Sequence, residues 1–187
     1  MTQEPHAARR TDAERNRTLI LEVARDALAR SGEVTMKSIA QQAGVGQGTL
    51  YRHFPTREAL VLAVYRHDVG ELVDAAKDLL AEHEPAEALR LWFDRLAAFG
   101  RVKHGLAGVL HAATRRDLSA TYYQPVVDAI DRLLHAGRQA GQVRADVDAA
   151  DVLLLVSFLW RADQDEDWDR RARHLLRIAL DGLVTTR

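Results

Sequence analysis

Apolar residues recur at the spacing of an α-helix along nearly the whole chain, and the strict alternation of a half-buried strand is absent. The clearest case is the predicted first helix, whose apolar stripe consists of Leu19, Ile20, Val23, Ala24, Ala27 and Leu28. We expect Pro125 to kink or restart a later helix. The pattern predicts an all-α fold of about nine helices, at residues 12–31, 36–43, 46–54, 55–84, 85–102, 105–115, 119–142, 149–162 and 165–184.

The composition excludes several classes of protein. The chain has 187 residues and no cysteine, so disulfides and thiolate metal sites are excluded. The polar N-terminal residues, 1–17, lack the apolar core of a secretory signal. The longest apolar run, 152–160, is shorter than the ~20 residues that a membrane-spanning helix needs. We therefore expect a cytoplasmic protein without a membrane partner.

Two short predicted helices, 36–43 and 46–54, are joined by a tight turn at Gly44, a residue type that readily adopts a positive φ. Thr35 is placed to cap the first of them. Their inward face is predicted to consist of Ile39, Ala43, Val45, Leu50 and Phe54. The outward face of the second helix has no aliphatic side chain and carries Gly48, Thr49, Arg52 and His53, with Gln47 and Tyr51 on its flank. This arrangement predicts a helix-turn-helix.

The outward face suits a DNA duplex. A recognition helix enters the major groove by its N-terminal end, and glycines there, Gly46 and Gly48, let the backbone approach closely. Gln47 can read adenine through two hydrogen bonds. Residues 1–66 carry a net charge of +3 and the remaining chain carries −4, which fits a first part that meets an anion. Similar helix pairs also occur in proteins that do not bind DNA, but the polar face and the basic N-terminal arm favour DNA here.

The segment 35–65, TMKSIAQQAGVGQGTLYRHFPTREALVLAVY, resembles the DNA-binding signature of the TetR family of transcriptional regulators. The resemblance implies a disordered basic arm at 1–12, a helix-turn-helix domain at 13–66 and a ligand-binding and dimerisation domain at 67–187. It implies contacts with base edges from Gln47, Gly48 and Thr49. It implies contacts with the DNA backbone from Thr35, Lys37, Tyr51, His53 and Arg57.

The resemblance also implies a homodimer that reads an inverted-repeat operator. The predicted helix 149–162 is apolar on nearly every side, and the last helix carries a broad apolar stripe. A pair of such helices meeting its twofold mate would form a four-helix interface, although the same helices could instead close the core of a monomer. The interface residues that we predict are Leu153, Val156, Leu175, Leu176, Ala179 and Leu183.

A small-molecule effector is expected in the second domain. Candidate pocket residues combine aromatic walls with a few polar tips, which suits a mostly apolar ligand, although each of them could equally be part of the core. They are Trp92, Phe93, Leu96, Phe99, His111, Tyr122, Tyr123, Val127, Leu155 and Trp160. We expect no metal and no cofactor.

These features predict a sequence-specific transcriptional regulator, a repressor that a ligand releases from its operator. The alternative is a helix-turn-helix protein with an architectural or adaptor role and no effector. An enzyme is not expected, because the sequence shows no nucleophile–base pairing, no glycine-rich phosphate loop after a strand and no metal motif.

Overall fold

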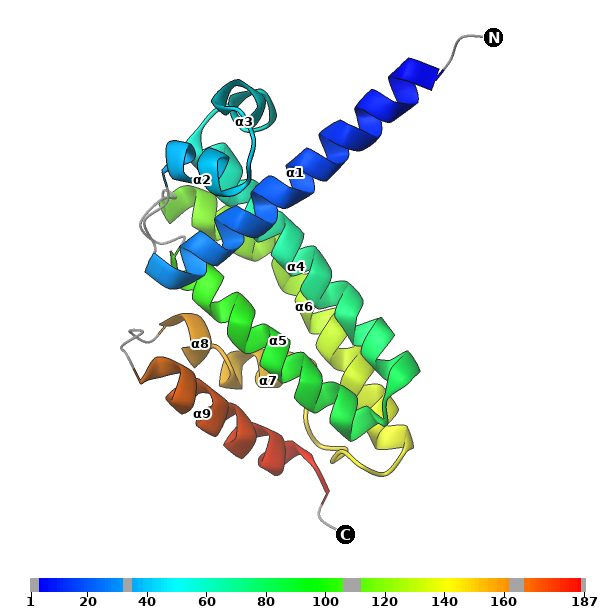
Figure 1. Ribbon diagram of the computed structural model, residues 1–187. Helices are drawn as coiled ribbons and strands as arrows, with labels where there is room; N and C mark the ends of the chain where they lie inside the picture. The colour runs from blue at the N-terminus through cyan, green and yellow to red at the C-terminus, as the bar shows by residue number, and fades with distance from the viewer. Residues whose placement is uncertain (1–3, 32–34, 106–111, 162–166, 186–187) are drawn as a thin grey trace. The chain divides into compact units, whose positions relative to one another are not determined.

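The computed structural model describes residues 4–31, 35–105, 112–161 and 167–185 (Figure 1). In these ranges the regular structure is helical, and the only pairing of extended backbone is an isolated bridge between Val143 and Val184. This confirms the predicted all-α fold. The helices are α1 (Glu4–Ser31), α2 (Met36–Gln42), α3 (Gln47–His53), α4 (Arg57–Glu82), α5 (Pro85–Gly105), α6 (Ala112–Gln139), α7 (Ala149–Leu155), α8 (Phe158–Arg161) and α9 (Trp168–Leu183).

The chain divides into two compact units between His67 and Asp68, a point that lies inside α4. We call the first unit, which contains α1 to α3 and the start of α4, the head. The second unit contains the rest of α4 and the helices α5 to α9. The predicted boundary at 66/67 lies beside this division. The functions assigned to the two parts remain predictions at this point.

Helix α1 differs from its prediction in where it begins and in which of its apolar residues are buried. It begins at Glu4 rather than at about Asp12, so most of the arm expected to be disordered is helical. The segment is rich in Ala, Arg and Glu, which are strong helix formers, and Pro5 is tolerated in a first turn. The apolar stripe is also displaced, because Leu19 is 40 % exposed. The buried residues of α1 are Ile20, Leu21, Ala24, Ala27 and Leu28.

Two predicted helix boundaries in the second unit are wrong. Helix α6 continues through Pro125, and the carbonyl of Thr121, which loses its partner there, belongs to an exposed residue that water can reach. The predicted helix 149–162 is broken into α7 and α8. At the break, the N–H of Ser157 donates to Leu154 O at 3.1 Å, a tighter turn than that of an α-helix. The predicted helix 105–115 is also wrong, because its described residues belong to the end of α5 and the start of α6. Within the described ranges the number of helices therefore agrees with the prediction although their limits do not.

Close packing and one buried hydrogen bond fix the core of the second unit. The indole Nε1 of Trp92 in α5 donates to the carbonyl oxygen of Leu72 in α4 at 2.8 Å. Gly100 in α5 lies against Leu159 in α8, where an added Cβ would be 3.1 Å from the Cβ of Leu159. The absence of a side chain at Gly100 thus lets α8 approach α5.

The loop after α6 ties together the ends of three helices. The side chain of Gln142 accepts a hydrogen bond from Ala86 N at the start of α5, at 3.0 Å. Its backbone oxygen accepts one from Thr185 N, just beyond α9, also at 3.0 Å. Arg144 N donates to Leu183 O at 3.0 Å. The C-terminal end of α9 is therefore held against this loop.

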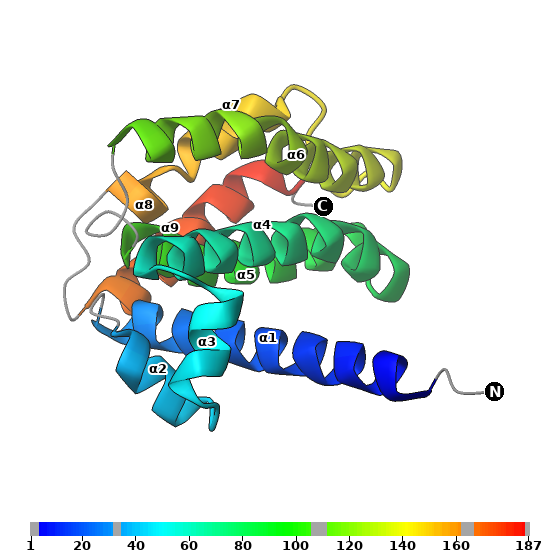
Figure 2. The same ribbon diagram turned by 90° about the horizontal axis from the view of Figure 1, so that it is seen from above.

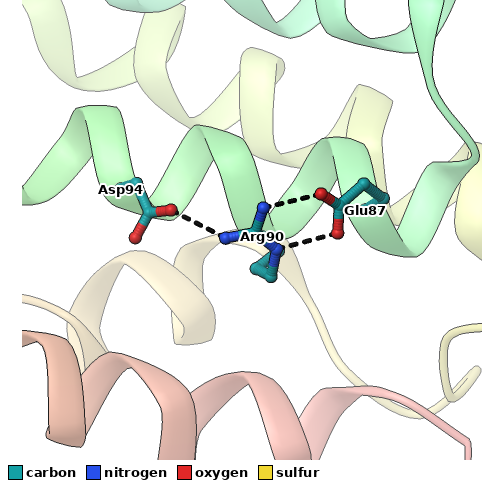
Figure 3. Close-up of polar contacts among 3 residues, drawn as sticks. All are labelled: Glu87, Arg90 and Asp94. Carbon is teal, nitrogen blue, oxygen red and sulfur yellow. Dashed lines mark hydrogen bonds and ion pairs between the residues drawn. The ribbon is translucent and has the colours of Figure 1, made fainter.

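On the surface of α5, Arg90 lies between two carboxylates, one turn away on either side (Figure 3). It forms a two-pronged pair with Glu87, at 2.6 Å and 2.8 Å, and a single contact with Asp94 at 2.9 Å. The hydrogen bonds from Arg90 lower the pKa of the Glu87 carboxyl. All three side chains are close to half exposed, so water and salt screen the group and it adds little to stability.

Gly137 in α6 provides a test of the packing against the loop. An alanine Cβ there would lie 2.9 Å from the Cβ of Val143, whereas one at Gly70 in α4 would meet nothing within 4 Å. We expect Gly137→Ala to lower the free energy of unfolding by about 1–3 kcal/mol, through overpacking. Gly70→Ala, the control, should raise it by about 0.5–1 kcal/mol. Urea unfolding followed by circular dichroism measures both, and equal effects of the two changes would contradict the packing described.

Candidate functional site

The turn between α2 and α3 has the geometry of a Schellman motif. Gly44 has φ +64°, its N–H donates to Gln41 O at 3.2 Å, and the N–H of Val45 donates to Ala40 O at 3.0 Å. An added Cβ at Gly44 would meet nothing within 4 Å, so the positive φ, and not a lack of space, is what favours glycine at this position. This turn sets the angle at which α3 leaves α2.

One side of α3 is buried in the head. Leu50 is fully buried, and Phe54, which caps the C-terminal end of the helix, is 3 % exposed. Ile39, Ala40 and Ala43 of the preceding helix are buried as well, with Ala43 at its C-cap. The apolar side of α3 is therefore the side that packs in the head, where α3 lies next to α2 (Figure 2).

The other side of α3 faces solvent. Gln47, Gly48, Tyr51 and Arg52 are exposed, and Thr49 and His53 are half-buried. None of these six makes a hydrogen bond through its side chain to another part of the described chain. An added Cβ at Gly48 would meet nothing within 4 Å. The structure thus presents together, on one short helix, the three residues predicted to contact bases and two of those predicted to contact phosphate.

The remaining predicted phosphate contacts lie at helix starts. Thr35 caps α2: its hydroxyl oxygen accepts from Ser38 N at 3.1 Å, and the hydroxyl donates to the Ser38 side chain at 2.9 Å. The Thr35 hydroxyl is thus already used within the head. Lys37 is exposed. Arg57 begins α4 and is half-buried, and its Nε is buried without a hydrogen-bond partner in the described part of the chain.

One residue next to the helix-turn-helix, Arg17 of α1, does not belong to its sequence pattern. In the structure its guanidinium carbon lies 5.6 Å from the centre of the Phe54 ring. The two residues are far apart in sequence, and no spacing rule joins them. The sequence offers one hint of this contact, which is the helical character of the segment before Ile20. Because α1 includes that segment, Arg17 is held on a helix near the C-terminal end of α3.

The predicted pocket residues separate into different environments. Trp92, Phe93, Leu96 and Phe99 are buried along α5 in the core of the second unit. Tyr123 is 49 % exposed, and Tyr122, Val127 and Trp160 are half-buried. His111 lies outside the described residues. Among the described residues no cluster of three or more His, Asp or Glu side chains is arranged to hold a metal ion.

An apolar groove of about 530 Å³ lies between α7 and α9. Of the predicted pocket residues it contains Leu155, and of the predicted interface residues it contains Leu175, Ala179 and Leu183. At its rim Arg144 pairs with Asp146 at 2.6 Å, and this hydrogen bond lowers the pKa of the Asp146 carboxyl. The full lining is Arg144, Val147, Asp151, Val152, Leu155, Phe158, Leu175, Ile178, Ala179, Gly182 and Leu183.

The other predicted interface residues face the protein's own core. Val156 is fully buried, Leu176 is 3 % exposed and Leu153 is 8 % exposed. The exposed apolar residues of the same helices are Leu154 at 65 %, Leu155 at 55 % and Ile178 at 54 %.

Two family models match the chain. Residues 20–64 match that of bacterial regulatory proteins of the tetR family, and residues 84–185 match that of the SbtR-like transcriptional regulator C-terminal domain. The chain belongs to the TetR family of transcriptional regulators. The helix-turn-helix of this TetR-family regulator is accordingly its DNA-binding domain.

Solved structures of TetR-family proteins are similar to this regulator over most of its length. A TetR transcriptional regulator from Streptomyces coelicolor, SCO0520, is 36 % identical with a TM-score of 0.81, covering 91 % of this chain and 99 % of that one. A TetR regulatory protein from Mycobacterium vanbaalenii is 37 % identical with a TM-score of 0.74, covering 94 % and 99 %. The HTH-type transcriptional regulator SAR0097 from Staphylococcus aureus is 37 % identical over 78 residues, which are 40 % of this chain and 41 % of that protein.

No helix in the described part of this TetR-family regulator is both long and apolar enough to cross a bilayer.

The cap at Thr35 gives a direct test of the geometry of the head. Thr35→Ala removes the acceptor for Ser38 N and should lower the free energy of unfolding by about 1 kcal/mol. Thr35→Asn supplies an equivalent side-chain oxygen and should keep the stability close to that of the wild type. Thermal unfolding of the two variants measures the difference. Loss of stability in both variants to the same extent would show that capping is not what Thr35 contributes.

Proposed function

We propose that this regulator binds an inverted-repeat operator as a homodimer through α3 and is released from it by a small, mostly apolar ligand. The observation that carries the DNA-binding part is the division of α3 into two sides. Leu50 and Phe54 are buried in the head, whereas Gln47 and Tyr51 are exposed and available to a partner. A helix N-terminus with free N–H groups and small residues suits close approach to a duplex.

Within this proposal the residues of the head have separate tasks. Gln47, Gly48 and Thr49 meet base edges in the major groove, where Gln47 recognises adenine. Tyr51, His53, Arg57, Lys37 and Thr35 meet phosphates, which position the head without reading sequence. Because the Thr35 hydroxyl already donates to Ser38, its share of a phosphate contact is the weakest of these assignments.

Selection of DNA fragments from a random pool, followed by fluorescence anisotropy at two salt concentrations, tests the DNA-binding proposal. We expect an inverted repeat to emerge. Gln47→Ala should relax the preference at one position of each half-site, at a cost of about 1–3 kcal/mol there. Tyr51→Ala should weaken binding to all sequences alike. If no sequence is enriched and binding disappears with modest salt, the protein is a non-specific DNA binder, as the architectural alternative requires.

The groove between α7 and α9 supports a twofold interface. It is lined mainly by apolar side chains, and Leu154, Leu155 and Ile178 beside it are more than half exposed. Contiguous exposed apolar surface of this kind marks an interaction site. A second copy of the chain is the proposed occupant, since a dimer would place two α3 helices in half-sites about 34–36 Å apart or a multiple of that distance. The proposed interface therefore consists of Leu154, Leu155, Leu175, Ile178, Ala179 and Leu183, and no longer includes Leu153, Val156 or Leu176.

Ile178→Glu tests this interface. In a twofold interface the substituted residue acts on both subunits, so one buried carboxylate in each should separate the dimer. Arg173→Gln, on another flank of α9, makes the same change in net charge and should leave the dimer intact. Sedimentation equilibrium gives the mass of each. If Ile178→Glu remained a dimer and Arg173→Gln became a monomer, the proposed interface would be wrong. The dimer would then use the opposite flank of α9.

The ligand-response part of the proposal is supported by the connection of α4 to α5. The Trp92 indole, which is a predicted pocket residue, donates to Leu72 O in α4, and α4 continues into the head. A ligand that favours another placement of α5 would act on α4 directly. A coupling of about 1–3 kcal/mol lowers operator affinity about 5- to 150-fold. A compound that binds tightly without changing operator affinity is not the effector.

A further inference from the structure

We infer that Arg17 of α1 is a phosphate-binding residue that the ring of Phe54 holds in place, so that α1 forms part of the DNA-binding surface. The inference rests on the proposed DNA-binding function and adds to it a residue from a helix outside the helix-turn-helix. It begins from one contact, the guanidinium of Arg17 over the ring of Phe54 at 5.6 Å.

The two partners of this contact differ in exposure. Phe54 is 3 % exposed, because its ring is part of the core of the head at the C-cap of α3. Arg17 is exposed. Glu14, three residues earlier on α1, is also exposed and makes no ion pair with it, and no other hydrogen bond or ion pair of Arg17 occurs within the described ranges. A fixed, buried ring therefore supports a cation whose N–H donors have no other partner there.

A guanidinium held in this way is suited to phosphate. The cation is attracted to the face of the aromatic ring, and its planar N–H donors match the oxygens of a phosphate in pairs. This contact also restricts a long side chain before the ligand arrives, so less conformational freedom is lost on binding. A lysine ammonium has neither the flat face nor the paired donors.

The place of the contact matches the predicted DNA surface. Phe54 directly follows His53, whose ring lies 6.2 Å from that of Phe54, and Arg52 is in the same last turn of α3. His53 is already a proposed phosphate contact. Arg17 of α1 and His53 of α3 therefore both lie beside the Phe54 ring, and Arg17 adds a positive charge at the C-terminal end of α3.

The salt dependence of DNA binding separates this role from a purely structural one. Each phosphate neutralised by a cationic side chain adds about 0.9 to the slope of log K against log salt concentration. Because the proposed dimer carries two copies of Arg17, we expect Arg17→Gln to reduce that slope by about 1.8, about 0.9 for each half-site, and to weaken binding to a selected and an unselected duplex alike. Arg17→Lys should keep most of the slope but bind more weakly. A structural cation–π contact would change the unfolding temperature and leave the slope unchanged.

Arg15→Gln is the matched control. Arg15 is exposed on the same helix and carries the same charge, but two residues of α-helix turn it about 200° away from Arg17. It should keep the wild-type slope. An unchanged slope in Arg17→Gln overturns the inference, and so does an equal loss in Arg15→Gln, which would reduce the effect to net charge.

The ring is tested by Phe54→Leu, which keeps an apolar side chain in the core. We expect this variant to keep most of the slope but to bind more weakly, as Arg17→Lys does, and Arg17→Lys to have no further effect in its background. If Phe54→Leu does not fold, the Arg17 and Arg15 variants decide the question. A wild-type protein that binds no duplex would overturn the proposed function itself, whereas a steep wild-type slope that survives Arg17→Gln would overturn only the role of Arg17.

Discussion

The burial of Leu50 and Phe54 is the interaction on which the head depends. These two side chains lie four residues apart and therefore share one side of α3, which they fix against the core. The opposite side carries Gln47, Tyr51 and Arg52, which are exposed and are therefore available to a partner outside the protein. Gly44 makes this possible, since its positive φ allows α3 to leave α2 at the angle that buries both side chains.

The second constraint is that α4 belongs to both units. Its first turns are in the head, its later turns accept the Trp92 hydrogen bond from α5, and no flexible linker lies between. A helix transmits displacement along its axis because its backbone hydrogen bonds resist bending. Under the proposed ligand response, a change at α5 would act on α4, whose backbone continues without interruption into the head.

Helical periodicity was sufficient to predict the fold class, and local chemistry predicted the cap at Thr35, which has the expected hydrogen bond. Periodicity could not predict which side of a helix faces the protein's own core and which faces outward, because apolar residues occupy both. Val156 and Ile178 illustrate this, one fully buried and the other 54 % exposed. The contact of Arg17 with Phe54 was equally inaccessible, since only tertiary structure brings these residues together.

Some glycines of the chain are required by the fold, and others are not. Gly44 is required by its φ, and Gly137 by the space that Val143 occupies. Gly48 has neither reason, and a glycine in a helix is less favourable than alanine by about 0.8–1 kcal/mol. Gly182, which lines the groove between α7 and α9, likewise has neither a positive φ nor a neighbour within 4 Å of an added Cβ. Both of these lie where we propose that another molecule approaches, the DNA backbone in one case and a second subunit in the other. The two glycines lower the stability of the free protein, and we attribute them to the space that a bound partner would occupy. Nothing in the structure explains Gly70.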